Sequence, residues 1–168
     1  MNRSKPKPSD GAMQEKHGGG SSGPLDVRVW LRMLSCTMTI DKQLRRRFAD
    51  QFDTTLPRFD VMASLDRHPR GQTMGQLSRA LLVSNGNVTA IVRQLQEQGL
   101  VETRPDPDDR RSSIAKLSEE GKIEFDRLAN AHHAWIGQAF AGLKPESQAA
   151  LYELLAEMKA SIAAEGQK

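Results

Sequence analysis

The sequence is poor in the features that mark export, disulfide chemistry and membranes. It has one cysteine, Cys36, no signal-like N-terminus, and no apolar run long enough to cross a bilayer. One cysteine excludes an internal disulfide, and the lack of a leader or spanning segment favours a protein of the reducing cytoplasm. We therefore expect a cytoplasmic protein that does not bind membranes.

Patterns of catalytic and metal-binding residues are also lacking. The sequence contains no recognisable set of nucleophile, base and oxyanion donor, and no glycine-rich phosphate loop. His132 and His133 are adjacent, so on a helix they point about 100° apart and cannot share one metal ion. The sequence predicts no enzyme, no metal and no cofactor.

The composition is that of one folded domain with a polar tail. Of 168 residues, 38% are hydrophobic and 27% are charged, which is typical of a single globular domain. Residues 1–24 are rich in Lys, Pro, Ser and Gly, so we expect a disordered tail before a domain at residues 25–165. The formal charge of +3 permits nucleic-acid binding without establishing it.

Residues 73–121 follow the order helix, turn, helix, strand, charged loop, strand and a further helix. Thr73 and Gln76 form a capping-box pattern, Ser84 is a favoured N-cap, and Gly99 suits a helix end. The apolar residues expected to be buried are Leu77, Ala80, Leu81, Val88, Ile91, Val92 and Leu95. This order predicts a mainly α fold with a small β-wing, a winged helix-turn-helix at residues 56–117.

The second helix of this unit begins with short polar side chains. Ser84, Asn85, Asn87 and Thr89 are donors and acceptors of the kind that read base edges in a major groove. The alternative is that they are helix caps and solvated polar positions, as Ser and Asn near a helix start often are. Both interpretations remain open from the sequence.

The loop PDPDDRR at residues 105–111 joins two short apolar strands. Its charges exclude it from a core. It suits a wing, in which an arginine enters the narrow minor groove and a neighbouring carboxylate fixes the guanidinium. A solvated, self-neutralising turn is the alternative.

These residues resemble the wing of the MarR family of transcription regulators. The matching segments are Gly99-Leu100-Val101, Arg104, Asp106-Pro107, Asp109-Arg110-Arg111 and Leu117-Ser118-Glu119-Glu120-Gly121. The resemblance implies a homodimer that binds a pseudo-palindromic operator in double-stranded DNA and is released by a small effector. A dimer over a promoter blocks polymerase, so repression is the expected outcome and activation is the alternative. The resemblance also implies that Arg111, supported by Asp109 and next to Arg110, contacts the minor groove. Where the family often has Asp-Arg, this sequence has Arg93-Gln94, so Arg93 is the expected phosphate contact.

Wide apolar faces at both ends of the domain favour a dimer formed by residues 25–52 and 118–165. In the first helix the apolar positions are Leu25, Val29, Trp30, Leu31, Met33, Leu34, Cys36, Met38, Ile40, Leu44 and Phe48. A second helix at Leu56–Arg67 should bury Phe59, Met62, Ala63 and Leu65. The helix that follows Ser118 should run to about Gly142, with Ile123, Phe125, Leu128, Ala131, Trp135, Ile136 and Phe140 as its apolar positions. The last helix begins near Lys144 and has Leu151, Leu154, Leu155, Met158 and Ile162 as its stripe.

A second resemblance concerns the effector. FDTTLPRFD (residues 52–60) and VSNGNVT (residues 83–89) are similar to the MarR branch that senses aryl-CoA thioesters such as hydroxycinnamoyl-CoA. It implies an apolar slot for the aryl group and fixed cations for the phosphates. The slot candidates are Trp30, Met33, Thr37, Ile40, Phe59 and Met62, and the cationic candidates are Arg45, Arg46, Arg47 and Arg58. Ordinary core packing and a favourable charge at a helix C-terminus are the alternatives.

Two further functions are compatible with the sequence. Cys36 could sense oxidants, but the family's oxidation-responsive branch places tyrosine hydroxyls beside the cysteine, and the only tyrosine here is Tyr152. A buried, inert thiol is the preferred interpretation. The other alternative is a winged-helix module that binds proteins and does not read DNA.

Overall fold

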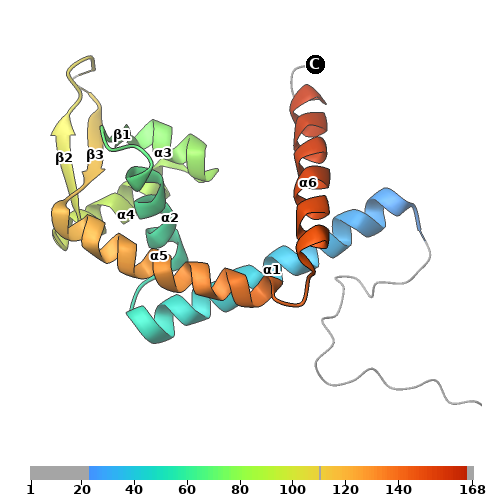
Figure 1. Cartoon of the computed structure of the whole chain (residues 1–168). Helices are drawn as coiled ribbons and strands as arrows, with labels where there is room; N and C mark the ends of the chain where they lie inside the picture. The colour runs from blue at the N-terminus through green and yellow to red at the C-terminus, as the bar shows by residue number, and fades with distance from the viewer. Residues whose placement is uncertain (1–22, 110, 166–168) are drawn as a thin grey trace, which may run out of the picture. The chain divides into compact units, whose positions relative to one another are not determined.

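The computed structural model describes residues 23–109 and 111–165. Within them the order of elements is α1 (Leu25–Phe52), α2 (Leu56–Asp66), β1 (Gln72–Thr73), α3 (Met74–Leu81), α4 (Asn85–Glu97), β2 (Val101–Pro105), β3 (Ser113–Leu117), α5 (Glu119–Phe140) and α6 (Pro145–Glu165) (Figure 1). The predicted mainly α fold with a small β-wing is confirmed. The predicted tail lies, up to residue 22, outside the described residues. The chain divides into two units, residues 1–53 and 54–168.

The first unit consists, in its described part, of the single helix α1. The helix ends at Asp53, which adopts the left-handed conformation (φ 48°) and donates its amide to the carbonyl of Phe48. Leu44 and Phe48 are buried as expected, and Phe48 packs on Phe52 with ring centroids 6.4 Å apart. Four residues of the predicted stripe are exposed, namely Leu25, Val29, Met38 and Trp30, the last at 52%.

The core of the second unit is built on α2. Thr55 precedes its first turn and Pro57 lies within that turn, where a missing amide hydrogen costs nothing. The helix buries Phe59 and Met62 as predicted, while Ala63 is only half-buried. The ring of Phe59 stacks on Phe125 of α5 at 5.8 Å. Burial of each large apolar side chain of this kind contributes about 1.5–3 kcal/mol. This contact joins α2 to α5.

The three strands of the described chain form one antiparallel sheet in the order β1-β3-β2. The short extended segment expected near Gln72 is present and pairs with Ala115 of β3. Gln72 is buried, and its side-chain oxygen accepts a hydrogen bond from the Ser64 hydroxyl of α2 at 2.8 Å. This bond satisfies a buried amide and fixes the sheet to α2.

The start of α5 is tied to the segment that follows α4. Ser118 caps α5 by accepting a bond from the Gly121 amide at 2.9 Å, and its hydroxyl donates to the Gly99 carbonyl at 2.6 Å. Gly99 has φ +74°, so the chain turns at the glycine that the sequence marked as a helix end. The end of α4 and the start of α5 are thus joined through the contact between Gly99 and Ser118.

The C-terminal helices differ in how much they bury. Within α5, Phe125, Leu128 and Trp135 are buried, whereas Ile123, another apolar position of the predicted helix, is 72% exposed. Ile123 lies in the second turn of α5, on a side that no described element covers. In α6 no residue is buried, and its predicted apolar stripe is exposed except at Met158, which is half-buried. None of the helices formed by the described residues combines the length and apolar character needed to cross a membrane.

Candidate nucleic-acid interface

Helices α3 and α4 form the helix-turn-helix. Thr73 accepts from the Gln76 amide, and the Gln76 side chain accepts from the Thr73 amide, so the predicted capping box is present. The turn is held by Ser78, whose hydroxyl donates to the carbonyl of Val83 at 2.6 Å. Leu82 ends α3 in the left-handed conformation (φ 55°), with its side chain 92% exposed. The turn is therefore well bonded but holds one non-glycine residue in an unfavourable conformation.

Burial along α3 is narrower than the sequence predicted. Leu77 is fully buried and Leu81 is half-buried, four residues later, but Ala80 is exposed, so its predicted burial is wrong. Helix α3 has only eight residues and buries one narrow side, on which Leu77 lies. Ala80 lies next to this side and remains exposed.

Helix α4 is sharply two-sided. Val88, Val92 and Leu95 are buried, whereas Asn85, Thr89 and Arg93, spaced by four, lie exposed along another side. Side chains four residues apart on a helix are neighbours, so these three form one continuous polar edge. The buried face fixes the helix in the fold and leaves this edge for a partner outside the chain.

The polar residues at the start of α4 do not all have the same local role. Ser84 accepts from the Asn87 amide at 3.4 Å, and the Thr89 hydroxyl donates to the Asn85 carbonyl at 2.8 Å. The cap interpretation therefore holds for Ser84. The side chains of Asn85 and Asn87 are exposed and form no hydrogen bond with any residue that the structure describes. These two amides keep their full capacity for an external partner.

Arg93 has only a weak local partner. Its guanidinium lies 3.6 Å from the carboxylate of Glu97, and the two side chains are 74% and 67% exposed. An exposed pair of this kind contributes little to stability, about 0–1 kcal/mol, and is easily exchanged for a phosphate.

Aspartates shape the tip of the β2–β3 hairpin. The Asp108 amide donates to Asp106 Oδ1 at 3.0 Å, and the Arg111 amide donates to Asp109 Oδ1 at 2.9 Å. Asp109 therefore supports the backbone at Arg111, whereas the family resemblance implied a bond to the guanidinium. The Arg111 side chain is exposed, and Arg110 lies outside the described residues. At the base of the hairpin, Lys116 and Glu102 form a cross-strand ion pair at 3.0 Å.

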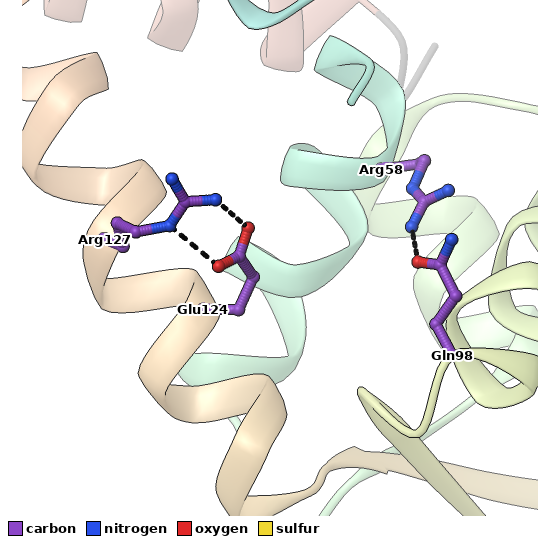
Figure 2. A network of polar contacts seen from close by, with 4 residues as sticks. All are labelled: Arg58, Gln98, Glu124 and Arg127. Atoms are coloured by element: carbon purple, nitrogen blue, oxygen red, sulfur yellow. Dashed lines mark hydrogen bonds and ion pairs between the residues drawn. The ribbon is translucent and has the colours of Figure 1, made fainter. Parts of the chain in front are cut away.

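Two of the effector candidates on α2 belong to the core. Phe59 and Met62 are buried, and the ring of His132 lies 4.7 Å from that of Phe59. Burial and the neighbouring His133 lower the pKa of His132 below its ordinary value. Arg58, in contrast, reaches across to α4, where its Nη2 donates to Oε1 of Gln98 (Figure 2). Its Nε is buried and has no partner among the described residues.

The other effector candidates lie on α1. Trp30 is exposed, Met33 and Ile40 are half-buried, and the Thr37 hydroxyl donates to a carbonyl of its own helix. The arginine cluster takes part in ion pairs along α1. Arg45 lies 2.7 Å from Asp41 and Arg46 lies 3.4 Å from Asp50, while Arg47 is half-buried. Cys36 is a half-buried free thiol, and Tyr152 lies exposed on α6.

Sequence reasoning missed Gln98 and Leu82. Gln98 gains its partner from a residue 40 positions away, for which no local pattern exists. Leu82 carried a usable signal, because a residue between two predicted helices must take a turn conformation.

Comparisons with known proteins agree with this geometry. Residues 52–112 match the sequence profile of the MarR family. The uncharacterized HTH-type transcriptional regulator YkoM of Bacillus subtilis is 36% identical over 84 residues, which are 50% of this chain and 54% of YkoM. This chain thus spans about half the length of that relative.

Solved structures extend the likeness over more of the chain. A MarR family transcriptional regulator from Silicibacter pomeroyi is 29% identical with a TM-score of 0.69, over 82% of this chain and 94% of that one. Another from Streptomyces coelicolor, in complex with DNA, is 23% identical with a TM-score of 0.71, over 88% of this chain and 92% of that one. The fold is therefore shared well beyond the helix-turn-helix.

Proposed function

We propose that this chain is a MarR-family winged helix-turn-helix protein that regulates transcription by binding operator DNA as a homodimer. The observation that carries the proposal is the two-sided character of α4, in which an exposed polar edge runs alongside a buried apolar one. MarR-family transcription regulators are not enzymes, so the proposed function includes no catalytic role.

Each candidate has a specific role on the duplex. Asn85 and Asn87 face base edges in the major groove, where an asparagine amide pairs best with adenine. The hydroxyls of Ser84 and Thr89 already form hydrogen bonds within α4, and their short side chains add polar contacts in the same groove. Arg93 contacts a phosphate.

The wing reaches the adjacent minor groove. Arg111 and Arg110 enter it, where the negative potential is highest if the groove is narrow. Asp109 supports this contact through the backbone, because its bond to the Arg111 amide fixes the hairpin tip from which the guanidinium extends.

A second copy of the chain completes the DNA-binding unit. Support comes from α6, a helix of 21 residues with none buried, and from the exposed apolar residues at the start of α1. A helix gains most of its stability by packing an apolar face, so the exposed apolar residues of α6 and of the start of α1 favour packing against a second copy of the chain. A two-fold dimer would place two α4 helices about 34 Å apart, in successive major grooves of a pseudo-palindromic site. A dimer over a promoter blocks polymerase, so repression is the proposed outcome.

The proposed effector is a small aromatic compound, specifically an aryl-CoA thioester. Support comes from the resemblance of residues 52–60 and 83–89 to the branch that senses such thioesters. The remaining candidates all lie on α1: Trp30, Met33, Thr37 and Ile40 for the aryl group, and Arg45, Arg46 and Arg47 for the phosphates. Phe59 and Met62 belong to the core and Arg58 binds Gln98, so these three are set aside. Thermal-shift titration tests the proposed effector directly. CoA thioesters should raise the melting temperature and weaken DNA binding, whereas stabilisation by the free acids alone would contradict the CoA assignment.

The DNA assignment is tested with the promoter of the protein's own gene. We expect nanomolar, salt-dependent binding that is reduced by Arg111→Ala, measured by fluorescence anisotropy over a salt series. A lack of preference for this promoter over unrelated DNA would contradict the assignment and leave the winged-helix module that contacts other proteins as the alternative.

A further inference from the structure

The last turn of α4 is held from outside by one long side chain. Gln98 follows α4 as its C-terminal cap, with φ −91° and ψ 0°, and its amide donates to carbonyls of the helix it ends. Its side-chain oxygen accepts from Nη2 of Arg58, on α2 (Figure 2). This bond joins residues 40 positions apart and connects two helices.

The other polar contact in Figure 2 provides a useful contrast. Glu124 and Arg127 both belong to α5 and pair with each other at 2.7 Å. A pair within one helix adds local stability but cannot set the angle between helices. The bond between Arg58 and Gln98 can do so, because each residue is fixed to a different helix.

The chain just after α4 is held separately, from α5. The Ser118 hydroxyl donates to the Gly99 carbonyl at 2.6 Å, and the Ser118 amide donates to the Leu100 carbonyl at 3.1 Å. These bonds fix where the chain leaves α4. They leave the rotation and tilt of its last turn to Gln98 and the buried apolar side of the helix.

Arg58 is not explained by a contribution to the stability of the folded protein. Its Nε is buried without a partner among the described residues, and an unpaired buried donor destabilises the folded state. Arginine's planar fork nevertheless suits a directional bond better than a flexible lysine would. Its position therefore favours a geometric role.

We infer that Arg58 is a positioning residue for operator recognition. By holding Gln98 it sets the orientation of α4, and thereby the place where Asn85 and Asn87 at the other end meet the bases. Helix α4 has 13 residues. At about 1.5 Å per residue, a 10° tilt about one end moves the other end by about 3 Å. Such a shift is enough to break bidentate contacts with bases. This inference rests on the proposed function.

The test compares two variants with two matched controls. Arg58→Met and Gln98→Ala each remove one partner of the bond. Arg67→Met removes a charge from an exposed residue at the end of α2, and Gln96→Ala removes an exposed amide from the last turn of α4. Affinity is measured for the operator and for an unrelated duplex at one salt concentration.

We expect Arg58→Met and Gln98→Ala each to weaken operator binding about tenfold, with less than about a twofold change on the unrelated duplex. The double variant should be no weaker than either single variant, because both remove the same bond. Gln98→Glu keeps an acceptor for the guanidinium and should keep the ratio of operator to unrelated affinity. Multiplied losses in the double variant, equal losses in the controls, or parallel losses on both duplexes would overturn the inference.

A second measurement does not depend on DNA. Amide hydrogen exchange at residues 95–98 should be faster in Arg58→Met than in Arg67→Met, because the last turn of α4 loses its external bond. Equal exchange in the two variants would overturn the inference even if operator binding is found. Absence of any operator preference in the unmodified protein would instead refute the proposed function and leave this measurement to decide the role of Arg58.

Discussion

Gly121, in the first turn of α5, lies against the carbonyl group of Leu100 so closely that an added Cβ would stand 1.9 Å from the oxygen. The start of α5 cannot simply move away, because Ser118 binds it to Gly99. The close contact between Leu100, just after the candidate recognition helix α4, and the start of α5 is thus possible only because residue 121 has no side chain.

Substitution of this glycine should be costly. Gly121→Ala forces backbone atoms apart and should lower the free energy of unfolding by about 1–3 kcal/mol, measured by urea denaturation. Gly137→Ala is the matched control, since Gly137 lies on the same helix with nothing within 4 Å of its added Cβ. The control should instead gain about 0.5–1 kcal/mol from reduced chain entropy. A neutral Gly121→Ala would contradict the packing described for this connection.

Leu82 should be a site of stored strain. Its φ of 55° is unfavourable for leucine, and its 92% exposed side chain loses no packing when it is removed. Leu82→Gly should therefore stabilise the protein by about 0.5–1 kcal/mol in thermal unfolding. Leu82→Val should destabilise it, because a β-branched residue tolerates positive φ least. If glycine and valine had equal effects, the left-handed conformation would not hold in solution.

Base and phosphate contacts should give different signatures on DNA. Asn87→Ala should weaken operator binding by about 1–3 kcal/mol and relax sequence preference at one position. Arg93→Ala should weaken binding to all duplexes and reduce the slope of log K against log salt by about 1. Anisotropy titrations on the operator and on single-base variants separate the two. An unchanged salt slope for Arg93→Ala would remove Arg93 from the interface.

Stability should fall in mildly acidic solution because of His132. Its pKa is lowered from 6.5 in the folded protein, first by burial and then by His133. The unfolded chain therefore takes up the proton first as the pH drops below 6.5. The stability contributed by the neutral ring is complete above that pH and is lost as the pH falls toward the folded pKa.

His132→Gln should flatten this part of the pH profile, measured as the urea midpoint between pH 7.5 and 5. His133→Gln is the control, because it removes only the smaller cause and should leave most of the dependence. A profile unchanged by His132→Gln would assign the acid sensitivity to other groups.

Much of the fold was determined by the sequence itself. The capping box at Thr73, the caps at Ser84 and Ser118, and the positive φ of Gly99 all follow from residues within a few positions of each other. Backbone amides at a helix end need acceptors, and a nearby side chain supplies them without help from the rest of the fold. The order of helices and strands could therefore be predicted.

Tertiary structure alone decided which side of each apolar stripe is covered and which distant residues meet. Ala80 and Ile123 fit helical patterns yet are exposed, because the face that a helix buries depends on partners elsewhere in the chain. Arg58 was predicted as a cation for an effector, but its bond to Gln98 spans 40 positions and leaves no trace in local spacing. Short-range hydrogen bonding is encoded residue by residue, whereas the choice of contacts between helices emerges only when the chain packs.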